Sequence, residues 1–490
     1  MVRVKGMHAW GGAIASLAAL VCGCYSVPCP SSDFAAIPCI APIDFDPGAA
    51  DTAVNPAASE LAGPHTVEAY VAVALQQNPR VHAARKTVVA KANRVPQAGS
   101  LEDPMVSVMG YPFTDLAPQF VNGRMTGGIG VSQKVPWNGK LDAMAEAAES
   151  ETNQARAQLA AAELEVVEKV RRAYHELHYA EEAVKITERD KAFLVTLAKL
   201  AEDRYKVNAA SQQDILRAQV EVSSLDADLI RMKQDREMAR ASLARLLHTS
   251  PETQLETQAD SSIQQIPSDI ERLYRDAIAH RPELHAQLAM IQQGQWMTET
   301  ARLNYLPDVT YNVDWEEMSR HNAMSSQADG IDMVRVGLMF NVPIYRKRLD
   351  AAVREAEAKV VASAREYDAM KDETQEEVKN LMLQVQSQWQ LSKLFGDSIV
   401  PKADQTLQMS LRAYQVGQTD ILQLVDNWRQ LLKMRLAQVR AETQLRQSLA
   451  SLERLVGGQL DLTVSPEPIP APEPRPVDDA PDSSKPGRPR

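Results

Sequence analysis

Cysteines, aromatic residues and long apolar runs are all scarce in this chain. All four cysteines lie within the first forty residues, so no disulfide is expected to hold the rest of the chain together. Aromatic residues make up only 5% of the sequence, which is low for a chain that is mostly sheet. After Cys24 no segment reaches the roughly 20 consecutive apolar residues of a transmembrane helix, so a membrane crossing would require β-strands or a lipid. The net charge is −11 without a basic patch, which argues against nucleic acid as a partner.

The first residues have the pattern of an export signal. Arg3 and Lys5 precede a short apolar run, which closes on Cys22, Gly23 and Cys24. This ending resembles a bacterial lipobox, with a small residue before the acceptor cysteine. We therefore expect residues 1–23 to be a lipoprotein signal peptide and Cys24 to be acylated. An ordinary secretory signal with incidental cysteines is the alternative. Residues 24–65 read as an extended arm that links the lipid to the body.

Proline and glycine are absent from two very long stretches. From about Asp142 to Tyr205, and again from Leu349 to about Leu394, neither residue occurs. At 1.5 Å per residue, the first stretch predicts a helix of about 90 Å, which must pack lengthwise against other helices. A seam with coiled-coil spacing supports this packing and consists of Val166, Val170, Ala173, Leu177, Ala180 and Val184. Shorter helices are expected from Asp214 to Leu247 and from Ile421 to Leu455.

One unit of about 200 residues occurs twice in the sequence. Residues 74–83 correspond to 277–286, and in each copy a Pro-marked hairpin and a very long helical region follow in the same order. This predicts a first repeat at 66–250, a linker at 251–267 and a second repeat at 268–458. The Pro-rich stretch at 459–490 is expected to be a disordered tail.

Each repeat contains one short pair of strands. Met105–Met109 and Gly128–Ser132 predict a hairpin at 104–136, and Val309–Val313 and Met333–Leu338 predict another at 307–343. Two hairpins cannot close a barrel, and lipid does not tolerate an open sheet edge. Three copies would supply about 12 strands, within the range of outer-membrane barrels. The strands therefore predict a homotrimer.

The order of these elements resembles the TolC-type outer-membrane efflux family over roughly residues 66–458. The resemblance implies a mainly α fold with a small β-barrel portion: long antiparallel coiled-coil helices form a trimeric α-barrel tunnel joined to a trimeric transmembrane β-barrel, with two structural repeats. It also implies a duct without catalytic residues or cofactors. The expected partners are a periplasmic adaptor (membrane fusion protein), an inner-membrane RND-type pump and outer-membrane lipid. The expected location is the outer membrane of a Gram-negative bacterium, lipid-anchored and extending into the periplasm.

The resemblance also assigns roles at the two helix–helix tips. Tip residues that would contact the adaptor are Tyr205, Val207, Asn208, Val416 and Gly417. Gly417 supplies the backbone freedom of a tight reversal, and Asn208 is the next best residue for left-handed geometry. Gate candidates are Asp214, Tyr414 and Thr419, where Thr419 stands in place of the family's gate arginine. A helix cap is the alternative role for Asp214, because Asp214 and Asp420 lie where helices begin.

Asp426 matches an acidic position that rings the tunnel mouth in the family. Threefold symmetry would make a ring of three carboxylates attractive to cations. The companion acidic position three residues earlier is Gln423 here, and a solvated surface charge is the alternative for Asp426.

Other sites are weakly indicated. His175 and His178 could form a metal pair, although a solvated helix face is the favoured interpretation. Met318, His321 and Met324 offer soft ligands, but a mobile loop is the better interpretation. The segments 99–105 and 132–136 look like members associated with heavy-metal exporters, so heavy-metal cations are one expected substrate; drugs and polypeptides stay open. A structural coiled-coil lipoprotein is the rival function, although a scaffold needs no barrel.

Overall fold

The computed structural model describes residues 63–111, 117–208, 210–258, 263, 265–321 and 323–458. These residues belong to one structural unit of the chain. The predicted signal peptide, the acylation site Cys24, nearly all of the N-terminal arm and the C-terminal tail lie outside the described residues. Within the described ranges, no helix combines the length and the apolar character needed to cross a membrane.

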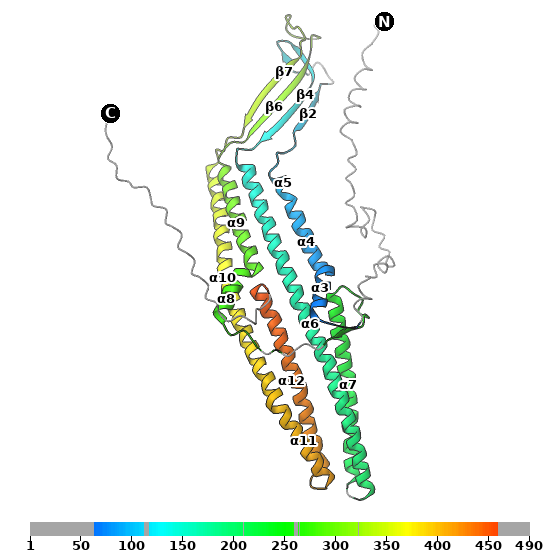
Figure 1. The fold of residues 1–490 in the computed structure, drawn as a ribbon. Coiled ribbons are helices and arrows are strands. Elements are labelled where there is room, and N and C mark those ends of the chain that lie inside the picture. The colour runs from blue at the N-terminus through cyan, green and yellow to red at the C-terminus, as the bar shows by residue number, and fades with distance from the viewer. Residues whose placement is uncertain are drawn as a thin grey trace, which may run out of the picture. The chain divides into compact units, whose positions relative to one another are not determined.

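The first half of the described chain runs from short helices through two strands into the longest helix. Its elements are β1 (Gly63–His65), α3 (Val67–Gln77), α4 (Pro79–Ala92), α5 (Arg94–Ala98), β2 (Met105–Gly110), β3 (Gln119–Phe120), β4 (Gly123–Val135), α6 (Lys140–Lys206) and α7 (Gln212–Leu246). With 67 residues, α6 is about 100 Å long, as its lack of proline and glycine predicts. Figure 1 shows α7 folding back along α6.

The second half presents a similar order of elements. It contains β5 (Leu255–Thr257), α8 (Ile270–His280), α9 (Pro282–Leu303), β6 (Val309–Ser319), β7 (Met333–Phe340), α10 (Arg346–Leu394), the π-helical segment η3 (Phe395–Ile399), α11 (Val400–Gln415) and α12 (Ile421–Val456). In both halves a proline opens the second short helix, Pro79 in α4 and Pro282 in α9, because its missing N–H costs nothing in a first turn. The stretch without proline and glycine from Leu349 to Leu394 lies within α10, and the helical path continues beyond it through η3 into α11.

The long helices pack through the predicted seam. Val166, Val170 and Leu177 on α6 are buried in one cluster with residues of α3 and α7. Ala180 and Val184 are also buried, and Ala173 packs partly buried against that cluster. The sequence did not predict the pairing of β1 with β5, a parallel contact that ties the end of the arm to the linker. Tyr174 fastens this pairing, since its hydroxyl donates to the carbonyl of Gln258 at 2.8 Å.

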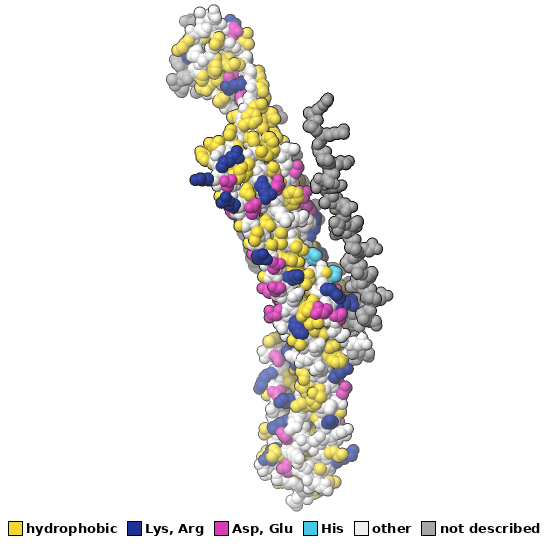
Figure 2. Space-filling view, turned by 90° about the vertical axis from the view of Figure 1, so that its left-hand side faces the viewer, with side chains coloured by type: hydrophobic (Ala, Val, Ile, Leu, Met, Phe, Trp, Pro, Cys, Tyr) yellow, Lys and Arg dark blue, Asp and Glu magenta, His cyan; other side chains and the backbone are white. Residues whose placement is uncertain are grey.

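The four longer strands form one antiparallel sheet in the order β2-β4-β6-β7, which contains both predicted hairpin strand sets. The register sorts their side chains into two faces, because residues paired across strands share a face. The apolar face carries Val106, Val108, Ile129, Val131, Tyr311, Val313, Trp315, Val334, Val336 and Leu338. The polar face carries Ser107, Ser132, Asn312, Asp314, Glu316 and Arg335. Figure 2 shows hydrophobic side chains gathered over the strands and at their base, and charged ones spread over the helices.

Asp308 joins the base of the sheet to the start of α6. It is 6% exposed, and its carboxylate accepts the Trp137 N–H at 3.2 Å and lies 3.3 Å from the Lys140 ammonium. A buried carboxylate with these partners fixes the strand β6 of the second half against the long helix of the first. The two outer strands of the sheet, β2 and β7, are open edges, because each has only one strand neighbour among the described residues.

Candidate functional site

The turn between α6 and α7 forms the first tip. Asn208 adopts a left-handed backbone with φ 59°, so the geometry predicted for it is confirmed. Ser211 caps α7, and Asp214 completes a reciprocal capping box. The Asp214 N–H donates to the Ser211 hydroxyl at 3.3 Å, and the Ser211 N–H donates to the Asp214 carboxylate at 3.1 Å. Asp214 therefore has the helix-capping geometry that the sequence favoured on local grounds.

The turn between α11 and α12 forms the second tip. Gly417 has φ 81°, the left-handed conformation expected for a glycine that ends a helix. The N–H of Gly417 donates to the carbonyl of Tyr414 at 3.1 Å, which closes the turn. Asp420 then caps α12 by accepting the Gln423 N–H at 2.9 Å. Val207 and Val416 are both well exposed at the two turns, as is Tyr205.

The two tips meet at Tyr414. Its side chain is buried, and the guanidinium of Arg204 on α6 lies over its ring, 4.6 Å from the centroid. Burial raises the pKa of the Tyr414 hydroxyl, and the charge of Asp214 acts in the same direction while Arg204 opposes it. Below this contact Leu197, Ile421 and Trp428 belong to one buried cluster drawn from α6, α7, α11 and α12. The structure thus brings together two gate candidates, Asp214 and Tyr414, from opposite halves of the chain.

Thr419 does not belong to this group. Its hydroxyl donates to the side-chain oxygen of Gln423 at 2.8 Å, so the two positions that depart from the family pattern bond to each other. Arg204, which no sequence motif singled out, supplies a cation beside Tyr414 from the other tip. Its position one residue before Tyr205 was the available signal, but only the packing of α6 on α11 shows which ring it covers.

Asp426 stands on the exposed side of α12, apart from the Tyr414 contact. Its carboxylate accepts the side-chain amide of Gln430 at 3.0 Å. One turn away, Arg429 donates to Glu221 of α7 at 3.0 Å. The side chain therefore has the exposure that either interpretation, a charged ring or a solvated surface carboxylate, requires.

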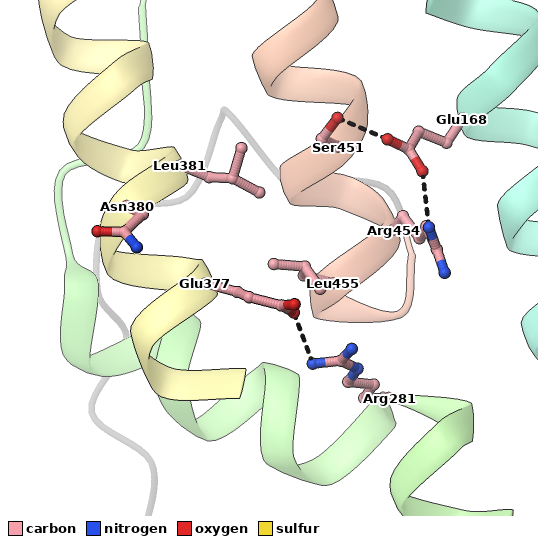
Figure 3. Close-up of a pocket in the computed structure, with 8 residues that line it drawn as sticks. All are labelled: Glu168, Arg281, Glu377, Asn380, Leu381, Ser451, Arg454 and Leu455. Atoms are coloured by element: carbon pink, nitrogen blue, oxygen red, sulfur yellow. Dashed lines mark hydrogen bonds and ion pairs between the residues drawn. The ribbon is translucent and has the colours of Figure 1, made fainter. Parts of the chain in front are cut away.

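A polar cavity of about 310 Å³ lies where α6, α10 and α12 meet the start of α9. Figure 3 shows Glu168 bonded to two residues of α12, and Arg281 paired with Glu377. Glu168 accepts the Ser451 hydroxyl at 2.6 Å and the Arg454 guanidinium at 3.0 Å. Every charged group drawn there has a protein partner, so we interpret the cavity as a joint between the two halves.

The histidine pair is not a solvated face, contrary to the sequence interpretation. His175 is 7% exposed, and burial, followed by the charges of Arg446, His178 and Arg171, lowers its pKa to about 3. His178 instead lies 3.0 Å from the hydroxyl of Thr257. Within the part of the chain that the structure describes, no three His, Cys, Asp or Glu side chains gather as a metal site would require.

Comparison with known proteins agrees with this arrangement. The family model described as "Outer membrane efflux protein" matches residues 71–248 and 273–458. The chain is 21% identical over 406 residues to the cobalt-zinc-cadmium resistance protein CzcC of Cupriavidus metallidurans, covering 81% of this chain and 91% of that protein.

Solved structures share the fold. The chain is similar to CusC, described for its transmembrane channel formation, with a TM-score of 0.69 and 17% identity over 81% of this chain and 93% of that one. It is also similar to the outer membrane protein VceC of Vibrio cholerae, with a TM-score of 0.67 and 19% identity over 80% of this chain and 96% of that one. At these identities the likeness concerns the fold.

Proposed function

The chain belongs to the outer membrane efflux protein family, and from that premise we propose that three copies form the outer-membrane duct of a tripartite export system. In this proposal a periplasmic adaptor and an inner-membrane RND-type pump deliver substrate to the helical end, and the substrate leaves through the strands. No chemical step is required of the chain. In this proposal the trimer encloses a channel, keeps it closed at rest and binds the adaptor and the pump.

The observation that carries the proposal is the sheet. One face is apolar and well exposed, with Val108 at 69% and Val336 at 73%, as strands that face lipid require. The other face is polar, as strands that line water require. The edge strands β2 and β7 leave backbone groups unpaired, which hydrocarbon does not tolerate. Three copies joined edge to edge would close a barrel of about 12 strands.

The helices extend the same path toward the periplasm. We propose that residues 66–250 and 268–458 are two structural repeats whose long helices line a trimeric α-barrel tunnel, continuous with the barrel. Support comes from the exposure of Tyr205, Val207 and Val416 at the tips, since exposed apolar residues on tight turns suit contact with another protein. The adaptor would dock there, and the contact between Arg204 and Tyr414 would hold the entrance closed until it does.

We further propose that Cys24 carries lipid after removal of residues 1–23, and that the lipid anchors the chain in the outer membrane. Mass spectrometry of the mature N-terminus tests this: the expected product is an acylated chain that begins at Cys24. An unmodified chain that begins at another residue would contradict the lipoprotein assignment. It would leave the duct untouched, because the strands themselves hold the membrane.

For the substrate we propose heavy-metal cations. The relative CzcC is named for resistance to cobalt, zinc and cadmium, and the alignment to it spans 81% of this chain. Drugs and secreted polypeptides are the alternatives. Cells that lack the chain should become sensitive to the exported cation and recover with the chain restored.

The decisive experiment for the duct combines assembly with conductance. The purified full-length chain should have the mass of a trimer in mild detergent and should conduct ions in a planar bilayer. A chain that is monomeric with its strands intact would refute the architecture. A trimer without conductance, even with the Arg204 contact removed by Arg204→Leu, would favour the rival structural lipoprotein.

A further inference from the structure

Methionines occupy a restricted place in the sheet. By the pairing register, Met105, Met109, Met125, Met318, Met333 and Met339 all lie on the polar face. A bulge between Met125 and Gly127 brings Met125 opposite Met318 on that same face. The strands place no methionine on the apolar face, where valine, isoleucine, leucine and aromatic residues are used instead. Among the four longer strands, methionine is thus the one large apolar side chain on the polar face.

Packing explains only two of the six. Met125 and Met318 are buried, at 3% and 5% exposure, and fill space at the far end of the sheet as flexible thioethers commonly do. Met105 and Met339 are 72% and 57% exposed, Met109 is also exposed, and Met333 is half-buried. An exposed side chain fills no gap. On a polar face its distinguishing property is a soft, polarisable sulfur atom.

The four remaining methionines stand only on the two edge strands. Met105 and Met109 are on β2, and Met333 and Met339 are on β7. Between them, the central strands present Gly128, Gly130, Ser132, Asn312, Asp314 and Glu316 on this face. Arg335 lies 3.6 Å from Asp314 and also pairs with Glu316, so the carboxylates are already engaged. Within one copy the two central strands, β4 and β6, separate the methionines of β2 from those of β7.

Closure of the barrel would bring them together. If β2 of one copy pairs with β7 of the next, neighbouring strands lie about 4.8 Å apart, and diagonal neighbours on one face about 7–8 Å apart. Two thioethers can approach one ion over such distances, because methionine has three rotatable side-chain bonds. The site is therefore incomplete in one chain and is completed by the partner copy.

We propose that each β2–β7 junction between copies forms a methionine strip on the inner wall that transiently binds soft monovalent cations, Cu(I) and Ag(I). The inference rests on the proposed trimeric duct and, among heavy-metal cations, points to soft monovalent ions rather than to the cobalt, zinc and cadmium for which the relative CzcC is named. Thioethers prefer soft ions, whereas hard divalent cations prefer oxygen ligands. A neutral, two-sulfur site holds an ion weakly enough to release it, as conduction requires.

The test uses the full-length protein in a planar bilayer, in nitrate buffer, with silver nitrate added. Micromolar Ag(I) should interrupt the single-channel current of the unaltered channel, whereas Mg²⁺ at the same concentration should not. The fourfold variant Met105→Leu, Met109→Leu, Met333→Leu, Met339→Leu keeps the size and apolarity of the side chains. Its half-blocking Ag(I) concentration should rise at least tenfold.

A matched control replaces two exposed methionines outside the sheet, Met238→Leu and Met409→Leu, and should behave as the unaltered channel. All variants keep the same cysteines, so block through thiols is common to all. The half variants, changed only on β2 or only on β7, should each lose most of the block, because the site needs both strands. They also preserve the test if the fourfold variant fails to assemble.

Equal block of the unaltered channel and of the methionine variants would overturn the proposal. So would a channel that conducts normally and ignores Ag(I), an outcome that leaves the proposed duct intact. Loss of block in one half variant alone would place the site on a single strand and refute the junction between copies. Absence of any conductance in the unaltered trimer would remove the duct and, with it, the inference.

Discussion

At the residue scale, Tyr414 carries the closure that we propose for the entrance, and its contact is weak enough to be broken. Its contact with Arg204 is a cation–π pair, worth about 0.5–2 kcal/mol depending on solvent access. Burial and the nearby Asp214 raise the pKa of the hydroxyl, so folding favours its neutral form. The contribution of the neutral Tyr414 hydroxyl to folding stability is fully present below the ordinary tyrosine pKa of about 10. It is lost only as the pH rises above that value. Closure through this residue should therefore not vary between pH 5 and pH 8.

We predict that Arg204→Leu increases the resting open fraction about fivefold, which corresponds to loss of about 1 kcal/mol of closing energy. Tyr414→Phe should increase it less, because the ring that Arg204 covers is retained. Single-channel recording of the purified trimer measures both. Arg412→Leu, which alters a nearby exposed arginine, is the control and should leave the resting open fraction unchanged. Equal effects of Arg204→Leu and Arg412→Leu would remove Arg204 from the gate.

Asp426 is predicted to act on ion selectivity instead. Its carboxylate is exposed and bonded to a neutral amide, so three symmetric copies would present their charge to passing ions. Asp426→Ala should lower the cation-to-anion permeability ratio by about two- to fivefold, the effect of roughly 0.4–1 kcal/mol. Reversal potentials in a salt gradient measure this ratio. If Asp228→Ala, which removes a partly exposed carboxylate of α7, has the same effect, Asp426 is ordinary surface charge.

At the element scale, the sheet depends on which face a side chain occupies. Val313 and Asn312 are neighbours on β6 and lie on opposite faces. We predict that Val313→Lys costs about 2–4 kcal/mol, because it places a charge against lipid. Asn312→Lys should be tolerated, since it faces the water-lined side. The fraction of folded trimer recovered from membranes reports both. Comparable recovery of the two variants would show that the apolar face does not meet lipid.

A glycine with a left-handed backbone ends α12. Gly457 has φ 83°, and a Cβ there would lie 2.5 Å from the carbonyl oxygen of His280. Gly457→Ala should therefore destabilise the fold by about 1–3 kcal/mol, through backbone strain and the clash. The neighbouring Gly458→Ala meets nothing within 4 Å and should be nearly neutral. Urea midpoints of the two variants compare them, and equal midpoints would refute the cap as a constraint.

At the scale of the whole molecule, buried charges join the two halves of the chain. Glu168 of α6 bonds to Ser451 and Arg454 of α12, and Arg454 also lies 3.4 Å from Glu283 of α9. Burial alone would raise the pKa of Glu168, but the hydrogen bonds from Ser451 and Arg454 outweigh it and lower the pKa. The resulting stability is present above the ordinary glutamate pKa of about 4.3 and is lost as the pH falls through the lowered value.

We predict that Arg454→Met destabilises the protein by about 2–3 kcal/mol, because it removes the nearer cation of the buried Glu168 and leaves only the more exposed Arg172, 3.4 Å away. This is below the 3–5 kcal/mol of a fully buried pair, since Arg454 is partly exposed. Adding Glu168→Gln should recover most of the loss. Arg365→Met, which breaks an exposed pair with Asp368, should cost less than about 0.5 kcal/mol. Chemical denaturation at pH 7 measures the free energy of unfolding of each of these variants. A double variant no better than Arg454→Met would contradict the explanation.

The sequence by itself determined the features that depend on neighbours along the chain. Stretches without proline and glycine indicate long helices, so the great length of α6 was predictable. The resemblance to the efflux family at the two tips likewise predicted the left-handed conformations of Asn208 and Gly417. The buried seam of α6 followed from its spacing of apolar residues.

Only the tertiary structure decided which distant residues meet. The pairing of β1 with β5 brings together segments about 190 residues apart, and three-residue strands carry no periodic signal. Arg204 covers Tyr414, and His175 is buried rather than solvated, because of how α6 packs on other helices. The methionines became a pattern only when the register assigned them one face of the sheet. A linear sequence specifies local geometry through sterics, but contacts between remote residues depend on how complete elements pack.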